Sequence, residues 1–282
     1  MSRAMTDRID AHQHFWHYSQ SEYDWIDASM ASLQHDLLPQ DLAPELATAK
    51  VDGVLTVQAR QTIEETRWLL QMADQFEWIR GVIGWAEIAG ENFCEELEIL
   101  TSNEHLKGLR HVVQAEQDPK FLLRDAFFSG IRALQGTSLV YDLLIVEHQL
   151  PNAIEFVRQH PNQLFVLDHI AKPKIAAGLL EPWRTNLRIL AKQQNVYCKL
   201  SGMVTEAAWD RWRIEDLRPY ADVVLETFGP RRLMIGSDWP VCTVGTSYSR
   251  WFSTLESLLQ SLSQSERERV FGGTAIESYR LI

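Results

Sequence analysis

Short apolar runs rich in β-branched residues alternate with longer segments of helical periodicity from one end of the chain to the other. In the segment from Thr62 to Phe76, apolar residues recur at a spacing of roughly 3.6 residues, which is typical of a helix with one buried face. The short runs have the length and composition of buried strands. We therefore predict eight strands, at residues 9–14, 53–58, 81–86, 108–113, 139–145, 164–169, 196–200 and 233–237.

The regular alternation of strand and helix predicts an α/β fold. No linker, low-complexity tract, fixed-period repeat or change of composition divides the 282 residues, so we predict a single domain over residues 1–282. Polar residues recur at the C-terminal ends of the predicted strands, which favours a closed (β/α)8 TIM barrel over an open doubly wound sheet. The connection from Phe15 to Pro44 is long, and we expect it to cover part of the barrel mouth.

The last twenty residues carry two signals for helix starts. Ser263 and Glu266 match a capping box, in which each side chain bonds the backbone N–H of the other residue. Thr274 and Glu277 match a second capping box. The two glycines at 272–273 lie between these pairs, and we expect them to end one helix before the next begins.

Composition and charge narrow the range of partners. The 27 Lys and Arg residues against 38 Asp and Glu give a formal net charge of −11, which disfavours phosphate backbones and anionic lipid, so we expect no nucleic-acid or membrane partner. The first ten residues contain no apolar core of a targeting segment, and no stretch approaches ~20 consecutive apolar residues. The three cysteines lack a CxxC pair, which predicts no disulfide framework and fits a cytoplasmic location.

Two histidines stand one residue apart in the first predicted strand, within IDAHQHFW. In a strand, side chains i and i+2 share a face, so His12 and His14 point the same way. Imidazole is the commonest protein ligand for a metal ion, although such a pair alone also occurs as two structural histidines bonded to backbone groups. The pair is therefore a candidate for two metal ligands.

Two further polar residues follow apolar strands. His169 ends the run LFVLDH, and Asp238 follows LMIGS. Burial of a carboxylate is unfavourable unless it contacts a metal ion or hydrogen-bond donors, so Asp238 is a candidate metal ligand. The simpler alternative is that Asp238 is the N-cap of the next helix. Three nitrogens and one carboxylate can hold a single Zn²⁺ or similar divalent ion with a position open to water. The predicted metal ligands are His12, His14, His169 and Asp238.

Five segments resemble the amidohydrolase superfamily, and within it the sugar-lactone hydrolases of the amidohydrolase-2 branch. They are DAHQHFW, KGLRHVVQ, LDHIAKP, VYCKLSGMVTEA and FGPRRLMIGSDWPVC. The resemblance covers nearly the whole chain and is greatest to the group of L-fuconolactonases and L-rhamnonolactonases. It implies a (β/α)8 barrel that hydrolyses a small lactone, such as L-fuconolactone or a related 6-deoxy aldonolactone, to its hydroxy acid.

The resemblance also implies roles for individual residues. It implies that His12, His14, His169 and Asp238 surround the reaction centre. From the chemistry of the residues we predict that Asp238 is the general base for water and that His169 and Lys199 are also catalytic. Superfamily members with two metals carry a bridging Lys or Glu after the fourth strand, where this chain has Arg110 and His111, so we expect a single divalent ion, zinc. Related pyrone-dicarboxylate hydrolases work without a metal, and metal-free catalysis therefore stays open.

Substrate contacts can be assigned from the direction of side chains. Lys199 lies at the exit of a strand and could bond the lactone carbonyl or the product carboxylate; the alternative is a lysine in a structural salt bridge. Arg110 and His111 alternate faces, and we expect His111 to contact the substrate and Arg110 to form a structural ion pair. Aromatic rings can lie against the apolar face of a sugar ring. The candidates for this contact are Trp16, Trp25 and Trp239, and the alternative for each is packing in the core.

Two other functions remain as alternatives. The first is non-oxidative, metal-dependent decarboxylation of an aromatic or unsaturated acid, which the same branch hosts. Those decarboxylases generally carry another histidine after a later strand, where this chain has CKLSG, so decarboxylation is the weaker hypothesis. The second is a non-catalytic carbohydrate-binding protein that keeps the barrel fold but has lost its active site. The presence of all four candidate ligand residues argues against this alternative. The sequence identifies neither the lactone nor the oligomeric state, and a homo-oligomer stays open.

Overall fold

Eight parallel strands pair in sequence order, from β1 to β8, and form one nearly closed barrel. The computed structural model describes residues 6–281; the first five residues, part of the segment where no targeting sequence is predicted, lie outside that range. The predicted (β/α)8 barrel is confirmed. The strands are β1 Ile9–Gln13, β2 Gly53–Val57, β3 Ile79–Gly84, β4 Leu106–His111, β5 Val140–Leu143, β6 Phe165–Leu167, β7 Val196–Leu200 and β8 Leu233–Ile235.

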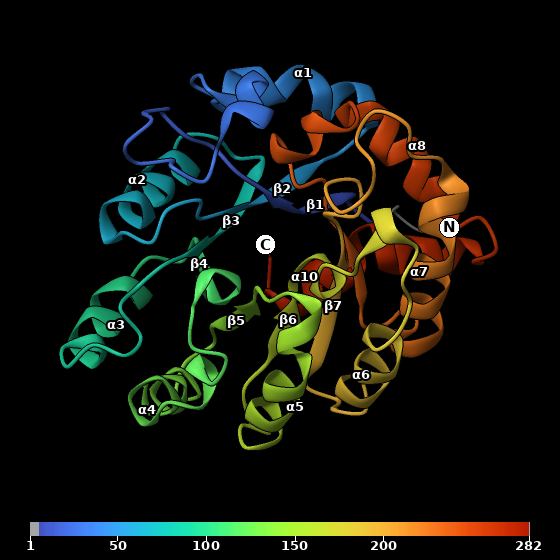
Figure 1. Cartoon of the computed structure of the whole chain (residues 1–282). Helices are drawn as coiled ribbons and strands as arrows, with labels where there is room; N and C mark the ends of the chain where they lie inside the picture. Colours follow the sequence, from blue (N-terminus) through green and yellow to red (C-terminus); the bar gives the residue numbers. More distant parts are fainter. Residues whose placement is uncertain (1–5, 282) are drawn as a thin grey trace, which may run out of the picture.

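Helices surround the ring of strands (Figure 1). Their apolar faces pack on the outside of the sheet, as the apolar spacing within residues 62–76 predicts for α2. Thr62 is the N-cap of α2, and its side chain accepts a hydrogen bond from the Glu65 N–H. The α-helices are α1 Pro39–Ala49, α2 Ile63–Ala73, α3 Phe93–Thr101, α4 Asp125–Leu134, α5 Leu150–Arg158, α6 Trp183–Leu190, α7 Ile214–Phe228, α8 Tyr248–Leu258, α9 Gln264–Glu268 and α10 Thr274–Ser278.

The barrel closes where β1 meets the chain after β8, and we call residues 10–14 and 237–239 the seam. The Asp238 N–H donates to the His12 carbonyl at 2.8 Å, and the His14 N–H donates to the Trp239 carbonyl at 2.7 Å. Buried Asp10 adds a side-chain link, because its Oδ1 accepts from the Ser237 N–H at 2.8 Å. The seam thus joins the first strand to the last.

The C-terminal segment differs in part from the prediction. Ser263 caps α9 in a capping box, as expected. The glycines at 272–273 do not end a helix, since they belong to a π-helical turn, Arg269–Gly273, that leads directly into α10. Thr274 is consequently the first residue of α10 and not its N-cap. Gly272 is required there, because a Cβ at this position would lie 1.8 Å from the Asp7 carbonyl oxygen.

The interior of the barrel is apolar at one end and polar at the other. Side chains from the strands form an inner apolar cluster, which Ala275 and Tyr279 join from the C-terminal segment. Figure 1 shows α10 at the centre of the ring of strands. Between this cluster and the mouth lie buried charged residues, including Asp142 and Lys199. Within residues 6–281, no helix is both long enough and apolar enough to cross a membrane, and the three cysteines are unpaired.

Candidate active site

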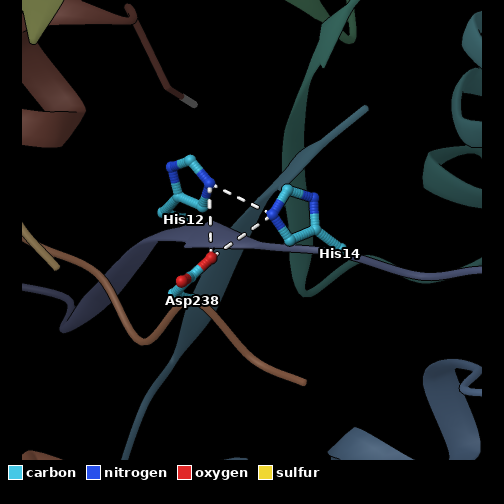
Figure 2. A group of neighbouring side chains, drawn as sticks. All are labelled: His12, His14 and Asp238. Atoms are coloured by element: carbon cyan, nitrogen blue, oxygen red, sulfur yellow. Dashed lines mark hydrogen bonds and ion pairs between the residues drawn. The ribbon is translucent and has the colours of Figure 1, made fainter. Parts of the chain in front are cut away.

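Three acceptor groups from the two sides of the seam meet at the mouth of the barrel (Figure 2). His12 and His14 extend from β1, and Asp238 follows β8. The two Nε2 atoms are 3.2 Å apart. Asp238 Oδ1 lies 3.4 Å from His14 Nε2 and 3.8 Å from His12 Nε2. All three side chains are buried, so the cluster is shielded from bulk water.

Neighbouring groups fix which nitrogen of each imidazole carries the proton. His14 Nδ1 lies 2.8 Å from the Val57 carbonyl, an acceptor, so Nδ1 is protonated and Nε2 presents a lone pair. Arg110 Nη1 lies 3.3 Å from His12 Nε2; because a guanidinium only donates, this Nε2 also presents a lone pair. The His12 Nδ1–H then faces Asp168 Oδ1 at 3.3 Å. The lone pairs of His12 Nε2 and His14 Nε2 therefore face each other.

The donor set fits one divalent ion. For tetrahedral zinc with bonds of about 2.05 Å, ligand atoms lie about 3.3 Å apart, and the three atoms here are separated by 3.2 to 3.8 Å. A second cluster, His12 with Asp168 and His169, fits an ion poorly. Asp168 is already paired with Arg110 at 3.1 Å and with Lys199 at 3.0 Å, and these cations neutralise its charge.

His169 approaches the same carboxylate through an uncommon backbone turn. Its Nε2 lies 3.8 Å from Asp238 Oδ1, and its Nδ1 lies 2.9 Å from the Ser201 hydroxyl. Four consecutive residues, 169–172, have φ between 46° and 60°, a left-handed conformation that costs roughly 1–2 kcal/mol per non-glycine residue. The Trp183 indole N–H donates to the Ile170 carbonyl at 2.7 Å and helps hold this left-handed turn.

The electrostatics keep His12 and His169 neutral and Asp238 ionised. Burial lowers the pKa of His12 and of His169 well below the ordinary value, despite nearby carboxylates. Burial alone would raise the pKa of Asp238, but His169 and His14 outweigh it, and the pKa lies below its ordinary value. Neutral imidazole and ionised carboxylate are the forms that bind a metal ion.

A cavity of about 690 Å³ opens above these residues. His14, His169 and Asp238 lie in its wall, whereas His12 lies beneath them. The connection from Phe15 to Pro44 covers part of the mouth, as predicted, and supplies Trp25 and Met30 to the cavity. The remaining wall contains both charged and apolar side chains, among them Arg60, Arg110, Gln114, Leu144, Lys172, Glu206, Trp209, Val241 and Val244.

Comparison with known proteins identifies the family. The amidohydrolase family model matches residues 9–281. The chain belongs to the amidohydrolase family. It is 41% identical over 285 residues to an L-fucono-1,5-lactonase from Burkholderia multivorans, covering 97% of this chain and 96% of that relative. A second L-fucono-1,5-lactonase, from Burkholderia ambifaria, is 35% identical over 283 residues, covering 98% and 97% of the two chains.

A solved structure is also similar. The crystal structure of an amidohydrolase from Burkholderia multivorans with bound zinc matches with a TM-score of 0.94 and 40% identity, over 98% of this chain and 100% of that one. The His/Asp cluster described above is the group within residues 6–281 of this amidohydrolase that fits a divalent ion best.

Arg110 forms the predicted ion pair in this amidohydrolase, with Asp168 at 3.1 Å, but its placement relative to His111 differs from the prediction. Arg110 lies in the cavity wall, whereas His111 does not. The His111 ring stacks on Phe121, with centroids 4.6 Å apart, and its Nε2 lies 2.7 Å from the Glu116 carboxylate. The expected orientation of the pair is therefore reversed. Alternation along a strand shows that the two side chains oppose each other, but it does not show which one faces inward.

Lys199 lies deeper than predicted. It is fully buried below His12, pairs with Asp142 and Asp168, and is absent from the cavity wall. The geometry does not support direct contact with a lactone. The lysine in the wall is Lys172, which the sequence pattern does not identify. A left-handed turn places residues 169 and 172 on the same side, and such a turn has no periodic signal in the sequence.

The three candidate tryptophans occupy different environments. Trp25 lies in the cavity wall and is 38% exposed. Trp16 is buried, with its indole N–H donating to the His35 carbonyl at 3.0 Å. Trp239 is buried against Phe15, with ring centroids 5.9 Å apart. The structure thus leaves only Trp25, among these three, in a position to contact a ligand in the cavity.

Proposed function

We propose that this amidohydrolase opens a sugar 1,5-lactone, such as L-fucono-1,5-lactone or a related 6-deoxy aldonolactone, to its hydroxy acid. The observation that carries the proposal is the Asp238 carboxylate beside two imidazole lone pairs in the wall of a cavity large enough for a monosaccharide. The names of the two Burkholderia relatives support the same reaction and suggest the substrate class.

His12, His14 and Asp238 would hold one divalent ion, which we propose is zinc, with His169 beside it. The zinc-bound Burkholderia structure supports this choice. When bound, such an ion polarises a carbonyl oxygen and lowers the pKa of water. Tyrosine and thiol nucleophiles are absent from the cavity wall as the structure describes it, so water is the reactant that completes the hydrolysis.

The protein residues then have separate tasks. Asp238 accepts a proton from the water that attacks the lactone carbonyl carbon. Arg110 and Lys172, two of the cations in the wall, can donate to the carbonyl oxygen as negative charge develops there. When the bond from carbonyl carbon to ring oxygen breaks, Asp238 returns the proton to that oxygen. The product acid ionises and releases one proton to the solution.

The cavity wall also suggests how a 6-deoxy sugar would be held. Glu206 and Gln114 can bond hydroxyl groups, and Trp25 offers a ring face to the apolar side of the sugar. An apolar part of the wall, with Met30, Val241 and Val244, suits the methyl group of a 6-deoxy lactone. These contacts predict a preference for the 6-deoxy lactone over its 6-hydroxy counterpart.

A panel of 1,4- and 1,5-aldonolactones in a weakly buffered pH-indicator assay tests the proposal. We expect catalysed acid release from L-fucono-1,5-lactone, above the spontaneous hydrolysis measured without protein, and its loss after treatment with a chelator. A decarboxylase would instead release CO₂ from aromatic acids and consume protons. Absence of catalysis on every lactone by zinc-loaded, folded protein would refute the proposal.

A further inference from the structure

A row of buried polar side chains connects the candidate active site with the opposite end of the barrel. Tyr279, at the end of α10, donates its hydroxyl to Asp142 Oδ1 at 2.7 Å. Asp142 Oδ2 accepts a hydrogen bond from the Lys199 ammonium. Lys199 Nζ lies 3.0 Å from Asp168 Oδ1 and 3.3 Å from His12 Nδ1. We call these five residues the deep row.

The deep row extends to the end of the barrel where the strands begin. The turn that leads into α10 packs against Asp7, just before β1, with Gly272 in contact with its carbonyl. Tyr279 belongs to the inner apolar cluster and is 2% exposed. Neither Tyr279 nor Asp142 lies in the cavity wall. Neither is therefore placed to contact a substrate in the cavity, and the hydrogen bonds that connect them to the candidate site run through Lys199.

His12 Nδ1 has two neighbours with opposite requirements. Asp168 Oδ1, at 3.3 Å, can only accept, and it favours a proton on Nδ1 with the Nε2 lone pair facing the site. The Lys199 ammonium, also at 3.3 Å, can only donate, and it favours the proton on Nε2. In that second tautomer His12 could not bind a metal ion through Nε2. Arg110 Nη1, 3.3 Å from Nε2, also only donates and, like Asp168, favours the proton on Nδ1. The direction of the Lys199 N–H groups therefore shifts the balance between the two tautomers.

Asp142 and Tyr279 both lie in contact with the Lys199 ammonium. The ammonium has three N–H groups, and its carboxylate partners are Asp142 and Asp168. Tyr279 orients Asp142 through its hydroxyl, and its ring centroid lies 5.5 Å from Lys199 Nζ, within the range of a cation–π contact. We propose that Asp142 and Tyr279 are positioning residues: they draw the Lys199 N–H groups toward Asp142, weaken donation to His12 Nδ1 and so keep the His12 Nε2 lone pair directed at the reaction centre.

The test is the tautomer of His12 in metal-free protein, observed by ¹⁵N NMR of histidine-labelled chains. We expect the proton on Nδ1 in the wild type and a larger Nε2–H population in Asp142→Asn, whose amide accepts more weakly from Lys199. Zinc affinity, measured by competition with a chelating indicator, should fall about 10- to 100-fold in Asp142→Asn. Tyr279→Phe should shift both readouts in the same direction by a smaller factor.

Tyr220→Phe is the matched control, because it removes another buried tyrosine hydroxyl, one that donates to the Lys174 carbonyl at 3.4 Å outside the barrel. It should change neither readout. If Asp142→Asn does not fold, Tyr279→Phe decides the question. An Nε2–H tautomer in the wild type, or an unchanged tautomer and zinc affinity in the folded variants, overturns the inference. The inference rests on the proposed function for the role of His12, yet neither readout requires lactone turnover, so the two can fail separately.

Discussion

Asp238 is held at the reaction centre by its own backbone. Its φ of 60° lies in the left-handed region, which aspartate adopts more readily than most residues, and its N–H and C=O are both bonded, to the His12 carbonyl and the Cys242 N–H at 2.8 Å each. The side chain is consequently fixed before a substrate arrives. The sequence alternative of an N-cap does not apply, because the 3₁₀ helix that follows has Pro240 at that position.

Replacing Asp238 by asparagine tests its role as the base. Asparagine has the same shape but cannot accept a proton from water at neutral pH, so we expect Asp238→Asn to lower kcat about 10²- to 10⁴-fold on the preferred lactone. The pH-indicator assay measures this, with circular dichroism to confirm folding. Asp210→Asn, which alters an exposed aspartate, should retain full activity. Near wild-type kcat in Asp238→Asn would show that another group is the base.

Gly202 permits the close approach of His169. A Cβ at this position would lie 2.5 Å from His169 Nδ1, and its φ of 63° is left-handed. We expect Gly202→Ala to displace the imidazole and lower kcat about 100-fold, since a shift of about 1 Å in an active site can have that effect. Gly178→Ala is the control, because φ is 66° there but no atom lies within 4 Å. Equal losses of activity in both variants would contradict this explanation.

Among the elements, α2 organises one wall of the cavity through its first turn. Glu65 is buried, and its Oε2 accepts from the N–H groups of Ala59 and Arg60 at 2.9 and 2.7 Å. Its Oε1 accepts from the Tyr23 hydroxyl at 3.3 Å. The helix thereby ties the loop after β2 to the long connection after β1. Burial raises the pKa of Glu65 to about 7, because the hydrogen bonds and the Arg60 charge only partly oppose it.

This raised pKa predicts a dependence of stability on pH. The folded carboxyl keeps its proton up to about pH 7, whereas the unfolded one loses it near 4.5, so its contribution is full below pH 4.5 and is lost as pH rises through 7. We expect the wild type to lose up to about 3 kcal/mol more unfolding free energy between pH 4.5 and 8 than Glu65→Gln does. Urea denaturation measures this. Glu64→Gln, on the exposed side of the same turn, should keep the wild-type slope, and an equal slope in Glu65→Gln would contradict the prediction.

The strands could be predicted because apolar, β-branched runs bounded by helices have few other interpretations. The strand ends differ from the prediction: the sequence pattern extends the sixth strand through residues 168 and 169, but β6 ends at Leu167 and the left-handed turn follows. That turn depends on tertiary contacts such as the Trp183 bond, which a local pattern does not contain. The π-helical turn at 269–273 was missed for the same reason, since Gly272 is needed for contact with Asp7 and not for a helix end.

The site could be predicted only in part. His12, His14, His169 and Asp238 were identifiable as polar residues at the ends of apolar strands, and the structure brings them to one mouth. The sequence pattern does not show how far below the mouth of the barrel each side chain lies. Lys199 and Asp142 both occupy buried strands, and opposite charges in such positions do suggest a pair, but only the register of the closed barrel places that pair below His12.

At the scale of the whole molecule, the proposed ion would bridge the seam. Its ligands come from the end of β1 and from Asp238, three residues after β8, so binding would link the two edges of the barrel. At a zinc concentration of 100 times Kd, we expect an increase of about 2.7 kcal/mol in the free energy of unfolding. Amide exchange should slow in peptides covering residues 9–16 and 233–240 more than in residues 139–145. Removal of zinc by a chelator should reverse both effects, and uniform slowing across the barrel would argue against a bridging site.

The position of the seam also bears on how the protein acquires its activity during folding. Asp10 and Ser237, which bond across it, are 227 residues apart in the chain, so this contact is among the most non-local in the molecule. Contacts between distant residues carry the largest loop-closure entropy and tend to form late. A partly folded intermediate whose seam is still open would therefore have secondary structure and no reaction centre. Recovery of catalysis after dilution from denaturant should lag behind recovery of secondary structure, because enzymatic turnover reports the final closure of the barrel.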